Sequence, residues 1–362
     1  MLDLSSLKKA NRLLFSVPLR PVQGDRFQPT GFPGLGAATY QTKEGQKLLV
    51  ESAQSMANRL ETTCWDTATN QPVAALNGIS HVTITRNGEF LTDSMLEAHR
   101  INSPYLLNSA DRSFLDPFLT MLREQLGEEL VNSNNGLINR NGLAQTLLRF
   151  DVGSLLHGVF LSNKVKLNAS ASKAESIGGG RIRVARALSA FIEATGCRVA
   201  ASGGVKNDHV NPSGDTSAGF GNVPFARDEY VADKIECHIN LDLAQIRGFG
   251  LDEESEKLLV FLALYRVRKL LDGDLRLRTA CDLESVDREN ITATRPVNFT
   301  LPSLLELEAA LATSIERCST LMTQTASTFE DELKKGKAKK DDSSDSDEDA
   351  DSETDDSSDI QE

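Results

Sequence analysis

The stretch KIECHINLDLAQI (residues 234–246) decides the fold class, because an apolar side chain stands at every second position. The positions concerned are Ile235, Cys237, Ile239, Leu241 and Leu243. Such alternation is typical of a strand that has one face buried and the other face in contact with water. Residues 253–271 follow after a short gap and form a predicted long helix. A strand of this kind followed by a long helix indicates a fold that mixes strands and helices.

Outside this pair of elements, the pattern predicts an α+β fold, with an antiparallel sheet covered by helices on one face. Further strands are predicted over residues 12–19, 81–85, 155–161, 199–205 and 275–283. Further helices are predicted over residues 48–60, 116–126, 181–194 and 301–321. Two polar stretches, residues 24–45 and 206–229, interrupt the pattern and are predicted to be loops. Polar loops beyond about 15 residues are uncommon in compact domains and usually have a function.

The negative charge of the chain is concentrated at its C-terminal end. The formal net charge is -13, but residues 341–362 alone hold twelve acids and no Lys or Arg. The rest of the chain has 39 basic and 40 acidic residues, so any affinity for nucleic acid must come from local clusters. We expect a single domain over residues 1–329 and a disordered, basic-then-acidic tail over residues 330–362. The tail either keeps the protein soluble or mimics RNA and competes for a basic groove.

The cysteines and histidines show no spacing that is typical of a metal site or a catalytic site. The five cysteines form no CxxC pair, and none of the five histidines has a Cys or His partner at ligand spacing. We therefore expect no metal, no cofactor and no enzymatic activity. The chain also lacks an apolar run of about 20 residues and a signal-peptide core, which predicts a cytoplasmic protein. His209 stands in a polar loop and stays open as a general acid or base.

Three consecutive glycines followed by arginines form the most suggestive local feature. The glycines are Gly178, Gly179 and Gly180, and the arginines that follow them are Arg181, Arg183 and Arg186. If residues 181–194 form a helix, its N-terminus adds backbone donors and a partial positive charge to the guanidinium groups. That combination predicts a phosphate-binding site that follows a polynucleotide backbone. The alternative interpretation is a flexible linker.

Two other segments combine cations with aromatic side chains. The first, residues 24–33, contains Arg26, Phe27 and Gln28. The second, residues 219–227, contains Phe220, Phe225 and Arg227, and Lys206 precedes it in the chain. Aromatic rings that stack on bases, beside cations that hold phosphates, are what binding of single-stranded RNA requires. Arg59, on the polar side of the predicted helix over 48–60, is a further candidate. In both segments the alternative is a loop whose aromatic rings have only a structural role.

The same segments resemble one protein family. The residues that carry the resemblance are VPLRPVQGDRFQPTGFPGLG (17–36), LVESAQSMANRLE (49–61), RIRVARALSA (181–190), GGVK (203–206), GFGNVPF (219–225) and NLDLAQIRGFGL (240–251). Together they are similar to the backbone protein of type I-G (I-U) CRISPR surveillance complexes, or Cascade, within the RAMP superfamily. The similarity spans roughly residues 10–325, and the acidic tail lies outside it.

The resemblance implies a modified RRM-like (ferredoxin-like) core with finger and thumb insertions. It also implies copies that lie side by side along a CRISPR guide RNA (crRNA) as a helical filament, in a ribonucleoprotein for antiviral defence. Target DNA would be read by base pairing with the guide. Other subunits of the complex and a helicase-nuclease would be partners. Either residues 62–115 or residues 206–229 would supply the thumb. The alternative within the superfamily is an endoribonuclease that processes CRISPR RNA through His209.

Overall fold

The structure is a computed structural model that describes residues 2–32, 36–43, 45–109, 111–133 and 136–330. The described residues divide into two compact units, one made of residues 2–200 and 228–330 and the other of residues 201–227. Except for Glu330, the predicted tail over 330–362 lies outside the described residues. The single domain over residues 1–329 stays a prediction.

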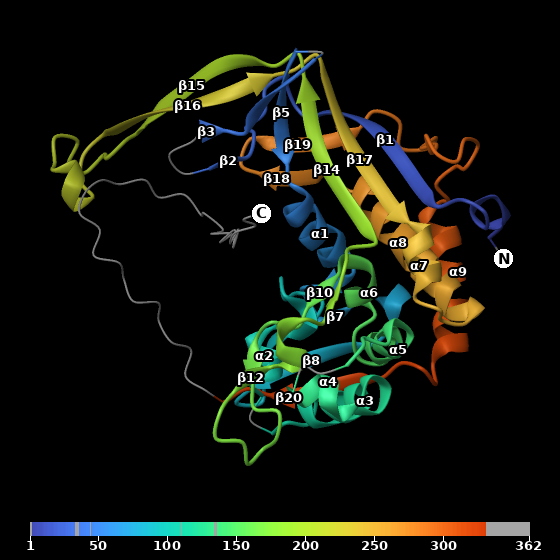
Figure 1. The fold of residues 1–362 in the computed structure, drawn as a ribbon. Helices are drawn as coiled ribbons and strands as arrows, with labels where there is room; N and C mark the ends of the chain where they lie inside the picture. The colour runs from blue at the N-terminus through green and yellow to red at the C-terminus, as the bar shows by residue number, and fades with distance from the viewer. Residues whose placement is uncertain (1, 33–35, 44, 110, 134–135, 331–362) are drawn as a thin grey trace. The chain divides into compact units, whose positions relative to one another are not determined.

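A seven-stranded antiparallel sheet is the centre of the first unit (Figure 1). Its strand order is β18-β19-β1-β17-β14-β5-β4. The strands are β1 (Arg12–Pro21), β4 (Thr39–Thr42), β5 (Gly45–Glu51), β14 (Leu188–Thr195), β17 (Lys234–Asp242), β18 (Leu275–Arg278) and β19 (Cys281–Ser285). In the middle of the sheet Phe15 of β1 lies opposite Ile239 of β17, which in turn lies opposite Ala190 of β14. All three are buried, so the alternation in the sequence sets the register.

Helices cover the buried face of this sheet. α1 (Ala53–Thr62) contacts β14, and α8 (Glu253–Asp272) contacts β19 and α1. Asp252 caps α8 by accepting a hydrogen bond of 2.9 Å from the Ser255 N–H, and Ser52 caps α1 in the same way. α9 (Leu304–Cys318) packs on α8, and α7 (Leu243–Gly248) follows β17 directly. The prediction of an α+β fold with an antiparallel sheet and packed helices is confirmed.

The rest of the first unit is a smaller layer of sheet and helix. Its three-stranded sheet, in the order β20-β8-β9, consists of β8 (His81–Arg86), β9 (Glu89–Asp93) and β20 (Gln324–Thr328). Its helices are α2 (Pro104–Leu107), α3 (Leu115–Leu126), α4 (Glu128–Ser133), α5 (Arg140–Phe150) and α6 (Gly153–His157). Short strand pairs are β2 (Gly31–Phe32) with β3 (Gly36–Ala37), β6 (Trp65–Asp66) with β7 (Gln71–Pro72), β10 (Val159–Phe160) with β13 (Arg183–Val184), and β11 (Lys164–Val165) with β12 (Glu175–Ser176). Single 3-10 turns are η1 (Ser5–Leu7), η2 (Ala74–Leu76), η3 (Arg100–Asn102) and η4 (Ile177–Gly180).

Strands β15 (Arg198–Lys206) and β16 (Val223–Val231) form a hairpin, and the second unit consists of residues 201–227 of this hairpin. The connection between the two strands contains the short turn η5 (Thr216–Ala218). The predicted strand over 199–205 is therefore confirmed, while the predicted loop over 206–229 is too long because β16 begins at Val223. No helix in the described part of the chain is long and apolar enough to cross a membrane.

The helix predicted over residues 48–60 begins too early, and the helix predicted over residues 181–194 is wrong. Both errors come from the period assigned to the apolar residues. Residues 45–51 form β5, and α1 begins only after Ser52. Residues 181–194 form β13 and most of β14, in which Leu188, Ala190, Ile192 and Ala194 are buried at every second position. Leu188 and Ile192 are four residues apart, which corresponds to about one turn of a helix or to two repeats of a strand. The apolar pattern therefore fits either element.

Two predicted strands also differ from the structure. Most of residues 155–161 lie in α6 and β10, which are separated at Gly158 by a φ of 80°. Residues 275–283 contain two antiparallel strands, β18 and most of β19, joined by a turn at Ala280 with a φ of 58°. In both segments a residue with positive φ ends one element, and neither turn contains an Asn-Gly pair like Asn87-Gly88 at the β8–β9 turn.

Candidate nucleic-acid interface

The hairpin unit holds four of the predicted site residues, namely Lys206, Phe220, Phe225 and Arg227. Asp208 organises the connection between its strands. One carboxylate oxygen accepts hydrogen bonds of 2.9 Å from the N–H groups of Val210 and Asn211, and the other accepts one of 2.8 Å from Gly221. These bonds lower the pKa of the Asp208 carboxyl. The loop is thus shaped by its own carboxylate, in the manner of an Asx turn.

Both predicted aromatic side chains of this unit are exposed. Phe220 is 53% exposed and Phe225 is 52% exposed. A Cβ added at Gly203 would come within 2.7 Å of the Phe225 carbonyl oxygen, and one at Gly204 within 3.2 Å of its ring. The two glycines therefore let the ring lie against the neighbouring strand while half of it stays in contact with water. Aromatic rings presented this way, with Lys206 exposed on the same unit, suit the stacking of unpaired bases.

The glycine–arginine feature is different from the prediction. Gly178, Gly179 and Gly180 have φ values of 58°, 62° and 72° and form a 3-10 turn, with no helix after them. A Cβ at Gly178 would lie 2.7 Å from the Ile182 side chain, so its lack of a side chain is a packing requirement. The predicted phosphate cradle at a helix N-terminus is therefore wrong.

The three arginines after these glycines do not form one stripe. Arg186 is half-buried and donates to the carbonyl oxygens of His157 and Ala53, each at 3.3 Å, and to Gln54. Arg181 is exposed and donates to Gly136 O at 3.2 Å. Arg183 is exposed on β13. Arg186 therefore holds segments of the chain together, and Arg183 and Arg181 are the two members that face solvent.

Of the predicted residues in the loop after β1, only Arg26 keeps an exposed side chain. Phe27 is 1% exposed, and its backbone bridges to Tyr230 through two hydrogen bonds of 2.9 Å, so the prediction that it stacks on a base is wrong. Gln28 is half-buried, and its backbone bonds to Ala280 at 2.8 Å. Arg26 is 57% exposed and lies 3.7 Å from the buried carboxylate of Glu229. The packed-loop interpretation holds for Phe27.

Arg59 also has a structural position. Its guanidinium lies 3.3 Å from the buried Glu51 carboxylate and donates to the carbonyl oxygens of Arg276 and Leu277, the first at 3.0 Å. Arg278 reaches the same carboxylate from β18. A buried carboxylate needs such partners because an unpaired charge in the interior is costly. Arg59 therefore ties α1 to β18, and the prediction that it faces RNA is not supported by this geometry.

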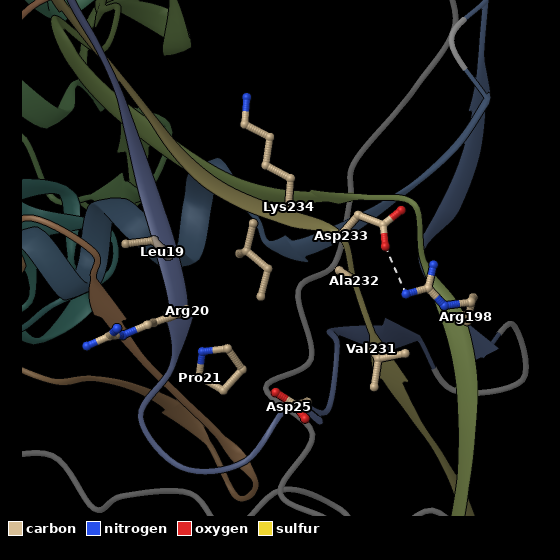
Figure 2. A pocket seen from close by; sticks show the side chains of 10 residues that line it. Leu19, Arg20, Pro21, Asp25, Arg198, Val231, Ala232, Asp233 and Lys234 are labelled. Atoms are coloured by element: carbon tan, nitrogen blue, oxygen red, sulfur yellow. Dashed lines mark ion pairs between the residues drawn. The ribbon is translucent and has the colours of Figure 1, made fainter.

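A cationic hollow in the first unit was missed from the sequence (Figure 2). It has a volume of about 450 Å³. Its lining residues are Leu19, Arg20, Pro21, Asp25, Arg198, Val231, Ala232, Asp233, Lys234 and Ile235. We call this site the cationic hollow. Its three cations stand at the ends of different strands, far apart in the sequence. The strand register, in which Leu19 faces Ile235, places Arg20 and Lys234 on neighbouring strands at the hollow. Two acids, Asp25 and Asp233, belong to the same lining.

The cations of the hollow form solvent-exposed ion pairs with acidic side chains. Arg198 pairs with Asp233 at 2.8 Å (Figure 2), Arg20 with Glu284 at 2.9 Å and Lys234 with Glu236 at 2.8 Å. The three cationic side chains are 61%, 62% and 58% exposed in that order. Exposed ion pairs of this kind contribute about 0–1 kcal/mol. A phosphate group that enters the hollow can therefore compete for these cations at little cost.

A second grouping lies on the sheet itself and joins side chains from five strands. Glu193 accepts a hydrogen bond of 2.7 Å from Lys47 and another from Tyr40, and His238 lies 3.4 Å from it. His238 is also 3.1 Å from the hydroxyl of Ser16. Burial raises the pKa of Glu193, but the bonds from Lys47 and Tyr40 outweigh it and lower that pKa overall. Burial and the bond to Glu193 raise the pKa of the Tyr40 phenol, which therefore stays protonated and donates.

Comparison with known proteins gives one family. The model of the family described as CRISPR-associated protein GSU0053 matches residues 13–199, a little over half of the chain. No curated protein matches the sequence.

Two solved structures are distantly similar. The crystal structure of Thermofilum pendens Csc2 has 12% sequence identity and a TM-score of 0.31, over 86% of this chain and 76% of that one. A chain of a CRISPR RNA-guided surveillance complex, pre-nicking, has 12% identity and a TM-score of 0.36, over 75% of this chain and 73% of that one. Because both scores are low, the family match alone carries the argument.

Proposed function

This chain belongs to the family of CRISPR-associated protein GSU0053, and we propose that it is the non-catalytic backbone subunit of a CRISPR surveillance complex. Copies of the protein bind side by side along one guide RNA, and the guide pairs with target DNA. Other subunits of the complex contact the filament, and a separate helicase-nuclease cuts the DNA. The family match over residues 13–199 is the observation that carries this proposal.

The topology of the large sheet supports an RRM-like core. Its four strands β19-β1-β17-β14 are the fourth, first, third and second of the set in chain order. α1 lies between β1 and β14 in the chain, and α8 lies between β17 and β19. This order agrees with the βαββαβ arrangement that we propose for the core, with other segments inserted before β14 and the β15–β16 hairpin inserted between β14 and β17. Many RNA-binding proteins use this arrangement.

The contacts proposed for RNA are independent of base sequence. A subunit that accepts any guide must hold phosphates and stack bases without reading base edges. The β15–β16 hairpin is the proposed thumb, with Phe220 and Phe225 as stacking side chains and Lys206 and Arg227 as cations. In the first unit the cationic hollow, Arg26 and Arg183 supply further phosphate contacts.

Exposed hairpin residues give the clearest test. A variant with Phe220→Ala, Phe225→Ala and Lys206→Ala should keep its thermal unfolding temperature, because these side chains bury little area. Its affinity for guide RNA, measured by fluorescence anisotropy, should fall at least tenfold, since stacking contributes about 1–3 kcal/mol per base. Leu305→Ala, a substitution of a side chain that is 77% exposed on α9, is the matched control. Unchanged RNA binding by the hairpin variant would reject the hairpin as the thumb.

The grouping around Glu193 keeps an endoribonuclease as the second candidate. It brings together a histidine, a tyrosine and a lysine, which are groups able to transfer protons or stabilise a leaving oxygen. His209, the histidine favoured by the sequence, is exposed in the hairpin unit. However, Lys47 and Tyr40 both donate to Glu193, so neither group is available to act on a substrate. We therefore keep the proposal of a subunit without catalytic activity. Incubation with repeat RNA, with and without magnesium, tests it. If the wild type yields a discrete cleavage product that His209→Ala or His238→Ala does not yield, the protein is an endoribonuclease and the proposal of a non-catalytic subunit is rejected.

A further inference from the structure

The open face of the large sheet has an aromatic pair at its centre. Phe191 of β14 lies opposite His238 of β17 in the register, and their ring centroids are 5.1 Å apart with planes tilted by 36°. Phe191 is 37% exposed, although it stands on an inner strand of the sheet. Its neighbours in the strand, Ala190 and Ile192, are buried on the opposite face. Contact between an exposed phenylalanine ring and water is unfavourable in free energy. A ligand that covers the ring would remove this contact.

The imidazole of this pair is held in position by its neighbours. His238 lies 3.1 Å from the Ser16 hydroxyl on one side and 3.4 Å from the Glu193 carboxylate on the other. Both neighbours come from strands that pair with β17, and the hydrogen bond with Ser16 restrains the ring on one side. Two adjacent rings fixed in this way form a preorganised surface on which a planar group can stack. We call Phe191 and His238 the ring pair.

The acids on this face are paired and do not oppose a polyanion strongly. Lys47 lies 2.7 Å from Glu193, Lys234 lies 2.8 Å from Glu236, and Arg12 lies 2.6 Å from Asp242. Lys234 also lines the cationic hollow. It is four residues from His238 along β17, which corresponds to about 13 Å in an extended strand.

Protein partners fit this face less well. Among the described residues, the large apolar side chains exposed on it are Phe191 and Tyr40, and the hydroxyl of Tyr40 is already bonded to Glu193. A stable protein interface needs an apolar centre of greater extent. The face instead suits a single strand of nucleic acid, because a base can stack on its aromatic centre and a phosphate can bind the cations at one end. The acids on the face are paired.

We propose that the open face of the sheet binds single-stranded nucleic acid, with a base stacked on the ring pair and a neighbouring phosphate held at the cationic hollow. This site is separate from the hairpin unit and rests on the proposed function, since it presupposes that the protein binds a polynucleotide. Stacking requires no base-edge contact, so the site accepts any sequence. The shared chemistry allows the strand to be the guide RNA or an unpaired DNA strand.

Two substitutions at Phe191 and one control substitution at Phe160 test the proposal. Phe191→Leu keeps an apolar side chain in the strand and removes the ring face, whereas Phe191→Tyr keeps the ring. We expect Phe191→Leu to bind a uridine oligonucleotide about tenfold more weakly, a change equal to about 1.4 kcal/mol, and Phe191→Tyr to bind like the wild type. Phe160→Leu, at a side chain that is 49% exposed on β10, is the matched control for loss of an exposed ring. Thermal unfolding of each variant checks that the fold is kept.

Photocrosslinking gives a readout that a structural role would not produce. RNA that contains 5-iodouridine should crosslink to a peptide that contains Phe191 or His238, and the same measurement with iodinated single-stranded DNA shows which strand the site takes. Equal affinity of Phe191→Leu and wild type, with no crosslink on these peptides, would overturn the proposal while leaving the proposed function intact. Absence of any RNA binding by the wild type would instead reject the proposed function. A loss of self-association in Phe191→Leu without a loss of RNA affinity would assign the face to a second copy of the chain and overturn the proposal.

Discussion

Neutralising the cationic hollow should change how RNA binding depends on salt. Arg20, Arg198 and Lys234 stand around one space of about 450 Å³, and each is more than half exposed. Each phosphate that a cation neutralises on a single strand releases counterions and adds about -0.7 to the slope of log K against log salt. Because the hollow is proposed to hold one phosphate, replacing all three residues by Gln should therefore reduce the magnitude of the slope by about 0.7.

The assay is fluorescence anisotropy with a labelled single-stranded RNA at a series of salt concentrations. The wild type and the triple variant should differ most at low salt and converge as salt rises. Arg317→Gln is the matched control, because Arg317 is 44% exposed and holds Glu254 at 2.8 Å, outside the hollow. It should leave the slope unchanged.

One result would refute the reasoning. If the triple variant folds and its slope equals that of the wild type, the three cations release no counterions on binding. The hollow would then be only a surface depression whose cations serve their acidic partners. A lower slope with Arg317→Gln as well would indicate a general charge effect, not a site.

Four further outcomes follow from the positions of particular side chains. Phe27→Ala should lower the free energy of unfolding by about 3–5 kcal/mol, whereas Phe220→Ala should change it by about 0.5 kcal/mol or less; urea titration measures both, and equal effects would contradict the burial of Phe27. Arg186→Ala should destabilise the protein by about 1–3 kcal/mol and leave the salt slope of RNA binding unchanged; a smaller slope would restore it as a phosphate contact. Because the pKa of Glu193 is lowered in the folded protein, the stability that this carboxylate adds is present above its ordinary pKa and is lost as pH falls through the lowered one. Between pH 7 and pH 2 the free energy of unfolding of Glu193→Gln should therefore fall less steeply than that of the wild type. Identical pH profiles for the two proteins would argue against the hydrogen bonds to Glu193. Deleting residues 341–362 should tighten RNA binding at low salt if the acidic tail mimics RNA, and unchanged affinity would leave it a solubilising tail.

The alternation of apolar residues predicted the core of the fold correctly. β17 could be predicted from residues 234–242 because strands of a half-buried sheet must alternate, and α8 could be predicted from its long apolar pattern. β14 could not, since small apolar residues at spacings of two and four fit either period. The glycines at 178–180 were misassigned for the same reason, because a helix was expected after them.

The candidate site was only partly accessible from the sequence. The exposure of Phe220 could be predicted because the glycines around it indicate a surface loop, whereas Phe225 is exposed on strand β16, which the loop prediction missed. Phe27 stands in a similar setting, yet a backbone bridge to Tyr230, some 200 residues away, buries it. Arg59 and Arg186 look like surface cations, but long-range partners hold both. The cationic hollow and the ring pair depend on strand register, which residue patterns within one segment do not specify.

The mass of the assembly as a function of RNA length tests the central claim most directly. Purified protein is mixed with guide RNAs of increasing length, and the particle mass is measured by mass photometry at constant protein concentration. The account predicts that mass rises in steps of one protein subunit as the RNA lengthens. A complex with one protein copy at every RNA length, or particles that form equally without RNA, would contradict it.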